Sequence, residues 1–570
     1  MTTLPQSAAG ISLFTPKLVT ALREGYSLAR LRADAVAGLT VAVVALPLSM
    51  AIAIASGASP DRGLVTAIVG GFFVSVLGGS RFQIGGPAGA FIVLVSATIQ
   101  RHGYDGFLLA TMIAGLALAL TGILRLGTYI KYIPHPVTVG FTSGIAIIIA
   151  ASQIRDLLGL TLPAAEPAAL VPKLAVLGAS LGSVNPVAVI LSLSSIGLIV
   201  GLRRLRPHWP GFLIAVAIAG LATSVFGLSV ETIGSRFGAI PQGLPAPALP
   251  AISMTKITEV LPDALAMALL GGIESLLSAV VADAMSGRRH RSNCELVAQG
   301  TANVAAALFG GLIATGTIAR TATNVRAGAT SPMAGILHSA FLLLFLMVAA
   351  PLIAYIPLAT LAAVLAVVCW NMAERHQFLA ILRQSRGEAL VLLATFLITV
   401  FDDLATGIAV GVVLGSFLFM HRMTQLVSVT AEEGAVTAGE ADRPDRETEA
   451  DGYDPAVNSS DDILVYRISG PLFFGVAASI GPILERIGPY PRTVVIDLSD
   501  VPLVDSSAAR SLKTAVDGMR AKGAEVVIAA AEPQVRRVLK QEGLKPPVVR
   551  YAPGLAAARA VAITEAPAAA

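Results

Sequence analysis

Apolar segments long enough to cross a lipid bilayer follow one another through most of the first 420 residues. The chain is 55% hydrophobic and only 13% charged, whereas soluble domains carry roughly 25% charged residues. A helix needs about 20 apolar residues to span the hydrocarbon core, which indicates an α-helical membrane protein. We predict fourteen spans, near residues 35–55, 63–79, 83–99, 107–126, 136–154, 184–202, 210–228, 264–285, 295–313, 315–330, 333–354, 356–371, 388–401 and 404–421.

The third and tenth of these spans are interrupted by small and polar residues. Residues 85–91 read GGPAGAF, and residues 314–324 read ATGTIARTATN. Each interruption is third in its own set of seven spans, and an odd number of spans per set inserts the second copy upside down. Two broken helices can point their free N–H groups at one anion near the middle of the bilayer. The pattern therefore predicts two inverted seven-span repeats and a secondary transporter of anions.

Loop charges predict the orientation. With the N-terminus in the cytoplasm, the inner loops include 203–206 and 288–291, which are rich in Arg, while the outer loops hold Asp61, Glu166 and Glu231. The positive-inside rule then places both termini in the cytoplasm, so we expect a multi-pass protein of a bacterial inner membrane. The alternative reading of a basic loop is a patch that binds membrane lipid.

Composition divides the chain into four parts. We expect a cytoplasmic N-terminal segment at 1–33, the transport domain at 34–422, an acidic flexible linker at 423–460 and a small α/β domain at 461–565. The linker lacks the large apolar residues that a core requires. In the last part, apolar strand-like runs alternate with helix-like stretches, which is typical of an α/β domain.

Glu274 is the sharpest single candidate because it lies inside the apolar run 264–282. A charge at the centre of a membrane helix costs roughly 2.5–3.5 kcal/mol on insertion scales, so such a residue suggests a function. Burial disfavours an ionised carboxylate, and we expect Glu274 to take up a proton during transport. Ser278 is four residues further on, shares the same helix face and is expected to line the same cavity. The alternative is a structural carboxylate held by neighbouring helices.

Arg320 follows the start of the second interruption. A guanidinium binds sulfate or a carboxylate with two parallel hydrogen bonds; the alternatives are a cytoplasmic anchor or a partner for Glu274. In the first interruption, Gly85, Gly86 and Gly89 permit close approach, and Pro87 costs no hydrogen bond at a helix start. Small-residue packing between helices is the other explanation of these glycines.

Several functions are disfavoured. No His or Cys cluster has the spacing of metal ligands, and no Walker-type loop is present. We expect no metal, no cofactor, no ATP-driven pump and no enzymatic activity. The net charge of +4 does not indicate nucleic-acid binding, because the Arg residues lie in short loops between apolar spans.

Several short motifs together resemble the sulfate permease (SulP) family of anion transporters. They are Asp34 with AGLT at 37–40, PLSMA at 47–51, GSR at 79–81 before Gly86-Pro87, GFTSG at 140–144 and ESLLSA at 274–279. DLS at 497–499 and VDSS at 504–507 resemble the STAS domain (sulfate transporter and anti-sigma factor antagonist) that follows the membrane part in this family. The resemblance implies fourteen spans arranged as core and gate domains, a homodimer and an elevator-like displacement of the substrate.

The resemblance also implies a site. The anion would lie between the facing ends of the third and tenth spans, with an acidic residue in the eighth. These positions carry over to Gly86, Pro87, Ala88, Ala319, Arg320 and Glu274. Ala88 stands where many relatives have a hydroxyl or an aromatic ring, and Ala319 where some have serine. Anion contacts are therefore expected to depend more on backbone N–H groups in this chain.

The implied function is proton-coupled symport of a dianion. Residues 318–332 are similar to a bacterial subgroup that carries C4-dicarboxylates such as succinate or fumarate; sulfate is the other dianion considered. The rivals are a sodium-coupled bicarbonate symporter, whose members show Asp in place of Glu274, a passive anion channel, and a membrane-tethered signalling protein.

The tail is expected to regulate, to form the dimer contact or to bind a cytoplasmic protein partner. Ser507 occupies the position that is phosphorylated in soluble relatives of the STAS domain. A serine that caps the N-terminus of a helix is the alternative explanation.

Overall fold

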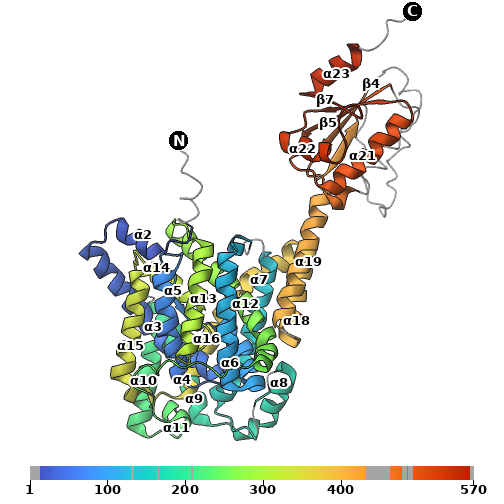
Figure 1. Cartoon of the computed structure of the whole chain (residues 1–570). Helices are drawn as coiled ribbons and strands as arrows, with labels where there is room; N and C mark the ends of the chain where they lie inside the picture. Colours follow the sequence, from blue (N-terminus) through green and yellow to red (C-terminus); the bar gives the residue numbers. More distant parts are fainter. Residues whose placement is uncertain are drawn as a thin grey trace, which may run out of the picture. The chain divides into compact units, whose positions relative to one another are not determined.

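The chain folds into two units, residues 1–415 and 416–570, each with its own hydrophobic core. The computed structural model describes residues 13–129, 134–163, 166–167, 169–206, 209–402, 404–431, 463–477, 484 and 492–564. Within these residues, nine helices are long and apolar enough to cross a membrane. Figure 1 shows how the helices of the first unit are arranged.

In the described residues of the first unit, the regular elements are helices and two very short strands. In chain order its elements are α2 (Lys17–Arg23), α3 (Leu28–Ala55), α4 (Pro60–Val65), the π-helical turn η1 (Thr66–Gly70), α5 (Gly71–Leu77), β1 (Gly85–Gly86), η2 (Gly89–Phe91), α6 (Ile92–Ile123), η3 (Leu126–Thr128), α7 (His135–Leu158), α8 (Leu170–Ala179), η5 (Leu181–Ser183), α9 (Pro186–Leu205), α10 (Gly211–Phe226), α11 (Ile233–Phe237), α12 (Met254–Ser286), α13 (Ser292–Leu308), β2 (Thr315–Gly316), α14 (Ile318–Arg326), α15 (Met333–Ile353), α16 (Leu358–Met372), α17 (Arg375–Gln384) and α18 (Arg386–Phe401). The next helix, α19 (Leu404–Thr424), begins in the first unit and ends in the second.

The predicted spans recur as helices or as a half-helix that follows a strand. Two of them, at 83–99 and 107–126, are joined in the long element α6, which contains a break at Gly103. Gly103 has φ 69° and ψ 176°, a left-handed conformation that glycine adopts without a steric penalty. Gly103 lies between the two predicted spans, so both spans belong to the single element α6.

Helix packing shows the exchange of roles that an inverted repeat requires. The first span of each half packs on the fourth span of the other: α3 packs on α15, and α12 packs on α6. These helices, with α5, α13 and α14, form the core set. A second group, the gate set, is built from α7, α9, α10, α16, α17 and α18.

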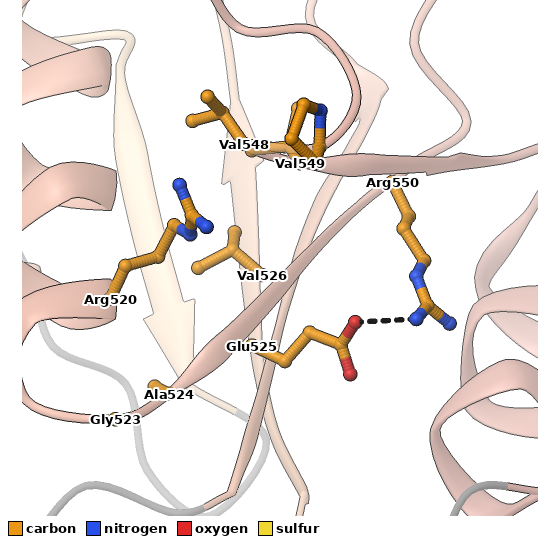
Figure 2. A pocket seen from close by; sticks show the side chains of 9 residues that line it. Arg520, Gly523, Ala524, Glu525, Val526, Val548, Val549 and Arg550 are labelled. Carbon is orange, nitrogen blue, oxygen red and sulfur yellow. Dashed lines mark ion pairs between the residues drawn. The ribbon is translucent and has the colours of Figure 1, made fainter.

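The second unit contains a five-stranded sheet in the order β3-β4-β5-β6-β7. Its strands are β3 (Ser428–Ala431), β4 (Ile463–Ser469), β5 (Thr493–Asp500), β6 (Glu525–Ala529) and β7 (Arg550–Ala552). Strand β3 is antiparallel to β4, and the other neighbours are parallel. The helices are α21 (Ser506–Ala521), α22 (Pro533–Gln541) and α23 (Leu555–Thr564). At the sheet edge, Glu525 of β6 pairs with Arg550 of β7 at 2.9 Å beside a shallow hollow (Figure 2).

The sheet begins earlier than the sequence indicates. Residues 428–431 fall in the expected linker 423–460, yet they form strand β3, with Val429 opposite Ile468. Both side chains are buried in the core of this unit. Because β3 is an edge strand of only four residues, its sequence carries little alternation from which to predict it. Most of the acidic stretch, 432–462, lies outside the described residues.

Candidate anion site

The two interrupted segments meet in the structure. Strand β1 of the third span pairs antiparallel with β2 of the tenth, with Gly85 opposite Gly316 and Gly86 opposite Thr315. The backbone N–H of Thr317 extends the ladder by donating to Ile84 O at 3.2 Å. Residues more than 200 positions apart therefore form one small sheet inside the helical unit.

A helix begins just after each strand. Ala88 precedes η2 and α6, and Thr317 precedes α14. Since the strands are antiparallel, the two helices begin at opposite ends of the small sheet, and each has the positive end of its dipole there. Ala88 is 5% exposed and Pro87 is buried, whereas Gly89 is partly exposed and Ala319 is exposed. Gly89 and Ala319 are therefore the accessible positions in the first turns of the two helices, whereas both strands are buried.

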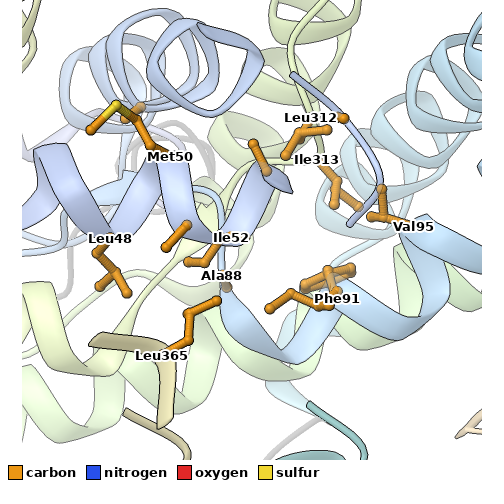
Figure 3. Close-up of a cluster of buried hydrophobic side chains, with 14 of the residues drawn as sticks. Leu48, Met50, Ile52, Ala88, Phe91, Val95, Leu312, Ile313 and Leu365 are labelled. Atoms are coloured by element: carbon orange, nitrogen blue, oxygen red, sulfur yellow. The ribbon is translucent and has the colours of Figure 1, made fainter. Parts of the chain in front are cut away.

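Apolar side chains surround the start of α6. Leu48 and Ile52 of α3, Phe91 of η2, and Leu365 of α16 belong to one buried cluster with Ala88 (Figure 3). Leu365 comes from the gate set, so this cluster joins both helix groups beside the site. Such a setting has few competing polar groups, which strengthens the electrostatic effect of a helix N-terminus or a charge.

Arg320 carries the buried positive charge of the site. Its side chain is 1% exposed, and Nη2 donates to Ser49 Oγ of α3 at 2.9 Å. A Cβ on Gly86 would overlap Nη1 of Arg320, so the guanidinium lies directly against β1. Nε and Nη1 have no hydrogen-bond partner among the described residues. Among the described side chains, Arg320 forms no ion pair with Glu274, which was one of the alternatives.

Polar side chains of the core set hold the second strand. Asn303 of α13 donates from Nδ2 to Ala314 O (2.8 Å) and accepts from Ala314 N at Oδ1 (2.7 Å). Ser275 of α12 accepts from the N–H of Gly316 at 3.3 Å. Sequence reasoning missed both residues. Asn303 lies within an apolar span, and that is the one signal by which it could have been found.

Glu295 holds the loop that leads into β1. It is fully buried, and its Oε2 accepts from the backbone N–H groups of Gly79 (2.8 Å) and Ser80 (3.0 Å). Gln299 donates to its Oε1 at 2.9 Å. Glu295 is not among the residues predicted from the sequence, because it stands at the first residue of the predicted span 295–313 and not in the middle of an apolar run.

Glu274 and Ser278 lie on α12, one turn apart, but in different surroundings. Glu274 is half-buried, and its helix neighbour Gly271 lies against Phe91 at the start of α6. Ser278 is fully buried, and its Oγ donates to Thr321 Oγ1 of α14 at 3.1 Å. Ser278 thus joins α12 to the tenth span, and contact of Ser278 with a cavity stays a prediction.

In the second unit, Ser507 is exposed in the first turn of α21. It does not cap the helix, so that alternative is wrong: the N-cap is Asp505, which accepts from the N–H of Ala508 at 2.8 Å. Asp suits this position because its carboxylate accepts from the free N–H groups of the first turn.

Comparison with known proteins identifies the family of the chain. The model of the sulfate permease family matches residues 31–395, and that of the STAS domain matches residues 454–558. The chain is 38% identical to "Putative sulfate transporter YvdB" of Bacillus subtilis (strain 168), covering 91% of this chain and 95% of that protein. It is 32% identical to the bicarbonate transporter BicA of Synechocystis, covering 90% of each.

A solved structure shares the fold. The murine Solute Carrier 26 family member A9 anion transporter, in the inward-facing state, superposes with a TM-score of 0.83 at 18% identity, covering 99% of this chain and 96% of that chain. The fold and the named relatives define a multi-pass membrane transporter of anions with a STAS domain. The chain belongs to the sulfate permease family.

Proposed function

We propose that the protein is a proton-coupled symporter of a dianion, either sulfate or a C4-dicarboxylate. The observation that carries this proposal is the pairing of two interrupted spans beside a buried arginine, two of whose nitrogens have no hydrogen-bond partner in the described part of the chain. Sulfate is favoured by the name of the relative with 38% identity. The dicarboxylate rests on the resemblance of residues 318–332 to a bacterial subgroup.

The anion would bind between the two helix starts. It would accept hydrogen bonds from backbone N–H groups. These lie in the turn that follows Gly86, Pro87 and Ala88 and in the turn that holds Ala319. Arg320 would add positive potential from behind β1, because its charge is fixed there by Ser49. Both alanines lack a side-chain donor, which leaves backbone N–H groups as the contacts.

Coupling would depend on Glu274. An ionised Glu274 repels an incoming dianion, and a proton on that carboxylate removes the repulsion. The core set would then move relative to the gate set in an elevator-like displacement, carrying the anion and the proton together. The direction of net transport would follow the two combined gradients.

The test is uptake into proteoliposomes that contain the purified full-length protein. Labelled sulfate, succinate, fumarate and bicarbonate are compared under an imposed pH gradient, with and without sodium. We expect one dianion to accumulate against its gradient only when the pH gradient is present, and Glu274→Gln to abolish that accumulation. Equilibration without accumulation would instead indicate a passive channel, and absence of uptake for all four anions would refute the proposal.

Sodium-coupled bicarbonate symport is the second candidate, because the relative from Synechocystis is named a bicarbonate transporter. It predicts bicarbonate accumulation that follows a sodium gradient and ignores the pH gradient. In the same assay, replacing the pH gradient by a sodium gradient distinguishes the two candidates.

The remaining proposals concern assembly and placement. We place the protein in a bacterial inner membrane with both termini in the cytoplasm, following the basic inner loops. The STAS domain would contribute to a homodimer or bind a cytoplasmic protein. Its exposed Ser507 would be available for phosphorylation.

A further inference from the structure

Glu374 occupies an unusual backbone position between two helices of the gate set. It has φ 39° and ψ 37°, a left-handed conformation, at the junction where α16 ends and α17 begins. Residues other than glycine adopt this conformation rarely, and such positions cluster at functional sites. The side chain is half-buried, so it is neither a plain surface charge nor part of the apolar core.

The junction that holds Glu374 lies beside the start of α6. Met372 is close enough that a Cβ on Gly89 would be 3.9 Å from its sulfur. The next residue, Ala373, is fixed to α7 because its carbonyl accepts from Ser143 Oγ at 2.7 Å. The gate set thus presents the Glu374 junction to the first turn after Ala88.

Glu274 approaches the same turn from the core set. A Cβ on Gly271, one helical turn before Glu274, would be 3.8 Å from the ring of Phe91. Gly89 and Phe91 are the first and last residues of η2. The two residues therefore flank the start of α6 from opposite helix sets, and the charge of Glu374 acts on Glu274.

We propose that Glu374 is the second carboxylate of a proton-binding pair with Glu274, formed between the gate set and the core set at the start of α6. This inference rests on the proposed function and deepens it. Two carboxylates held near each other share one proton more readily than either binds it alone.

A pair divided between two helix sets can couple protons to movement. While the sets are in this arrangement, the two carboxylates are close and hold the proton. When the core set moves, the pair separates and its proton affinity falls, so release follows the displacement. Among the described groups, His135 at the start of α7 also acts on Glu374. Arg375 is directed to the ring of Trp370, 4.6 Å from its centroid, and Arg320 is held by Ser49.

The first test is the pH profile of sulfate and succinate uptake by the full-length protein in proteoliposomes. We expect Glu374→Gln to move the pH of half-maximal uptake toward acid by about one unit, because it removes the charge that favours protonation of the pair. Glu374→Asn should act likewise, and Asn tolerates the left-handed backbone. Glu259→Gln, an exposed carboxylate on α12, is the matched control and should keep the native profile. A native profile in both Glu374 variants would overturn the inference.

The second test does not depend on transport. The thermal unfolding midpoint of the detergent-solubilised protein is measured from pH 5 to pH 8 for Glu274→Gln, Glu374→Gln and the double variant. For a coupled pair, either single substitution removes the loss of stability that accompanies ionisation of both groups, and the double variant removes no more. Additive effects would overturn the pair. If the unfolding midpoints show non-additive effects but neither sulfate nor succinate is taken up, the carboxylate pair is supported and the proposed function is refuted.

Discussion

At the residue scale, the space between Gly86 and Arg320 decides whether the site can form. A Cβ at position 86 would overlap the guanidinium, which is held by Ser49 and has almost no exposed surface. We therefore predict that Gly86→Ala displaces Arg320 and lowers the initial rate of anion uptake at least about tenfold, which corresponds to about 1.4 kcal/mol. Uptake into proteoliposomes, normalised to the reconstituted protein, measures the loss.

The matched control is Gly201→Ala on α9, where a Cβ would meet nothing within 4 Å. That variant should transport as the native protein does, because alanine is also the better helix former. If Gly86→Ala and Gly201→Ala transport equally well, the guanidinium is not fixed against β1 in the working protein.

The sequence predicted Gly86 and Arg320 as site residues through their type and spacing, but it could not predict their contact. They are separated by more than 200 residues, and the meeting depends on how two half-helices pack. Ser49 shows the same limit: it lies beside Pro47 in an apolar span, and nothing local marks it as the acceptor for Arg320. Backbone interruptions are visible in a sequence, whereas their long-range partners are not.

At the element scale, α13 positions strand β2 through one side chain. Asn303 satisfies both the N–H and the carbonyl of Ala314. Asn303→Ala leaves these two buried backbone groups without partners, and each such loss costs about 1–3 kcal/mol. We predict a lower unfolding midpoint of the membrane unit and a loss of uptake larger than the loss of folded protein. Thermal unfolding and uptake of the same preparation measure the two effects.

Thr258→Ala provides the comparison, because Thr258 is exposed on α12 and its hydroxyl bonds only within its own helix. A midpoint for Asn303→Ala equal to that of Thr258→Ala would show that β2 is held by other contacts. The spans themselves were predictable because hydropathy and length determine them. The hydrogen bonds of Asn303 and Glu295 to distant backbone groups were not predictable, because a polar residue inside a span does not reveal which backbone group it binds.

At the scale of the whole molecule, two separate cores indicate two units that can lose structure independently. The change in composition after residue 422 predicts a separate C-terminal domain, whereas the two units divide at residues 415 and 416. Sequence reasoning missed strand β3, because a short edge strand that precedes a long acidic stretch has no local pattern to distinguish it from that stretch. The parallel strands β4, β5 and β6 were predictable because each contains a short apolar run, at 463–466, 494–496 and 526–528, of the kind that a strand buried on both faces requires.

Independent cores lead to a prediction for unfolding of the full chain. Leu512 is fully buried in the STAS core on α21, and Leu512→Ala removes buried methyl groups at a cost of about 2–5 kcal/mol. Calorimetry of the full-length protein in detergent should show the STAS transition at a lower temperature and the membrane transition unchanged. Leu503→Ala, at a position 55% exposed in the same domain, should shift neither. If Leu512→Ala lowers both transitions equally, the two units unfold as one, and the STAS domain stabilises the transport domain directly.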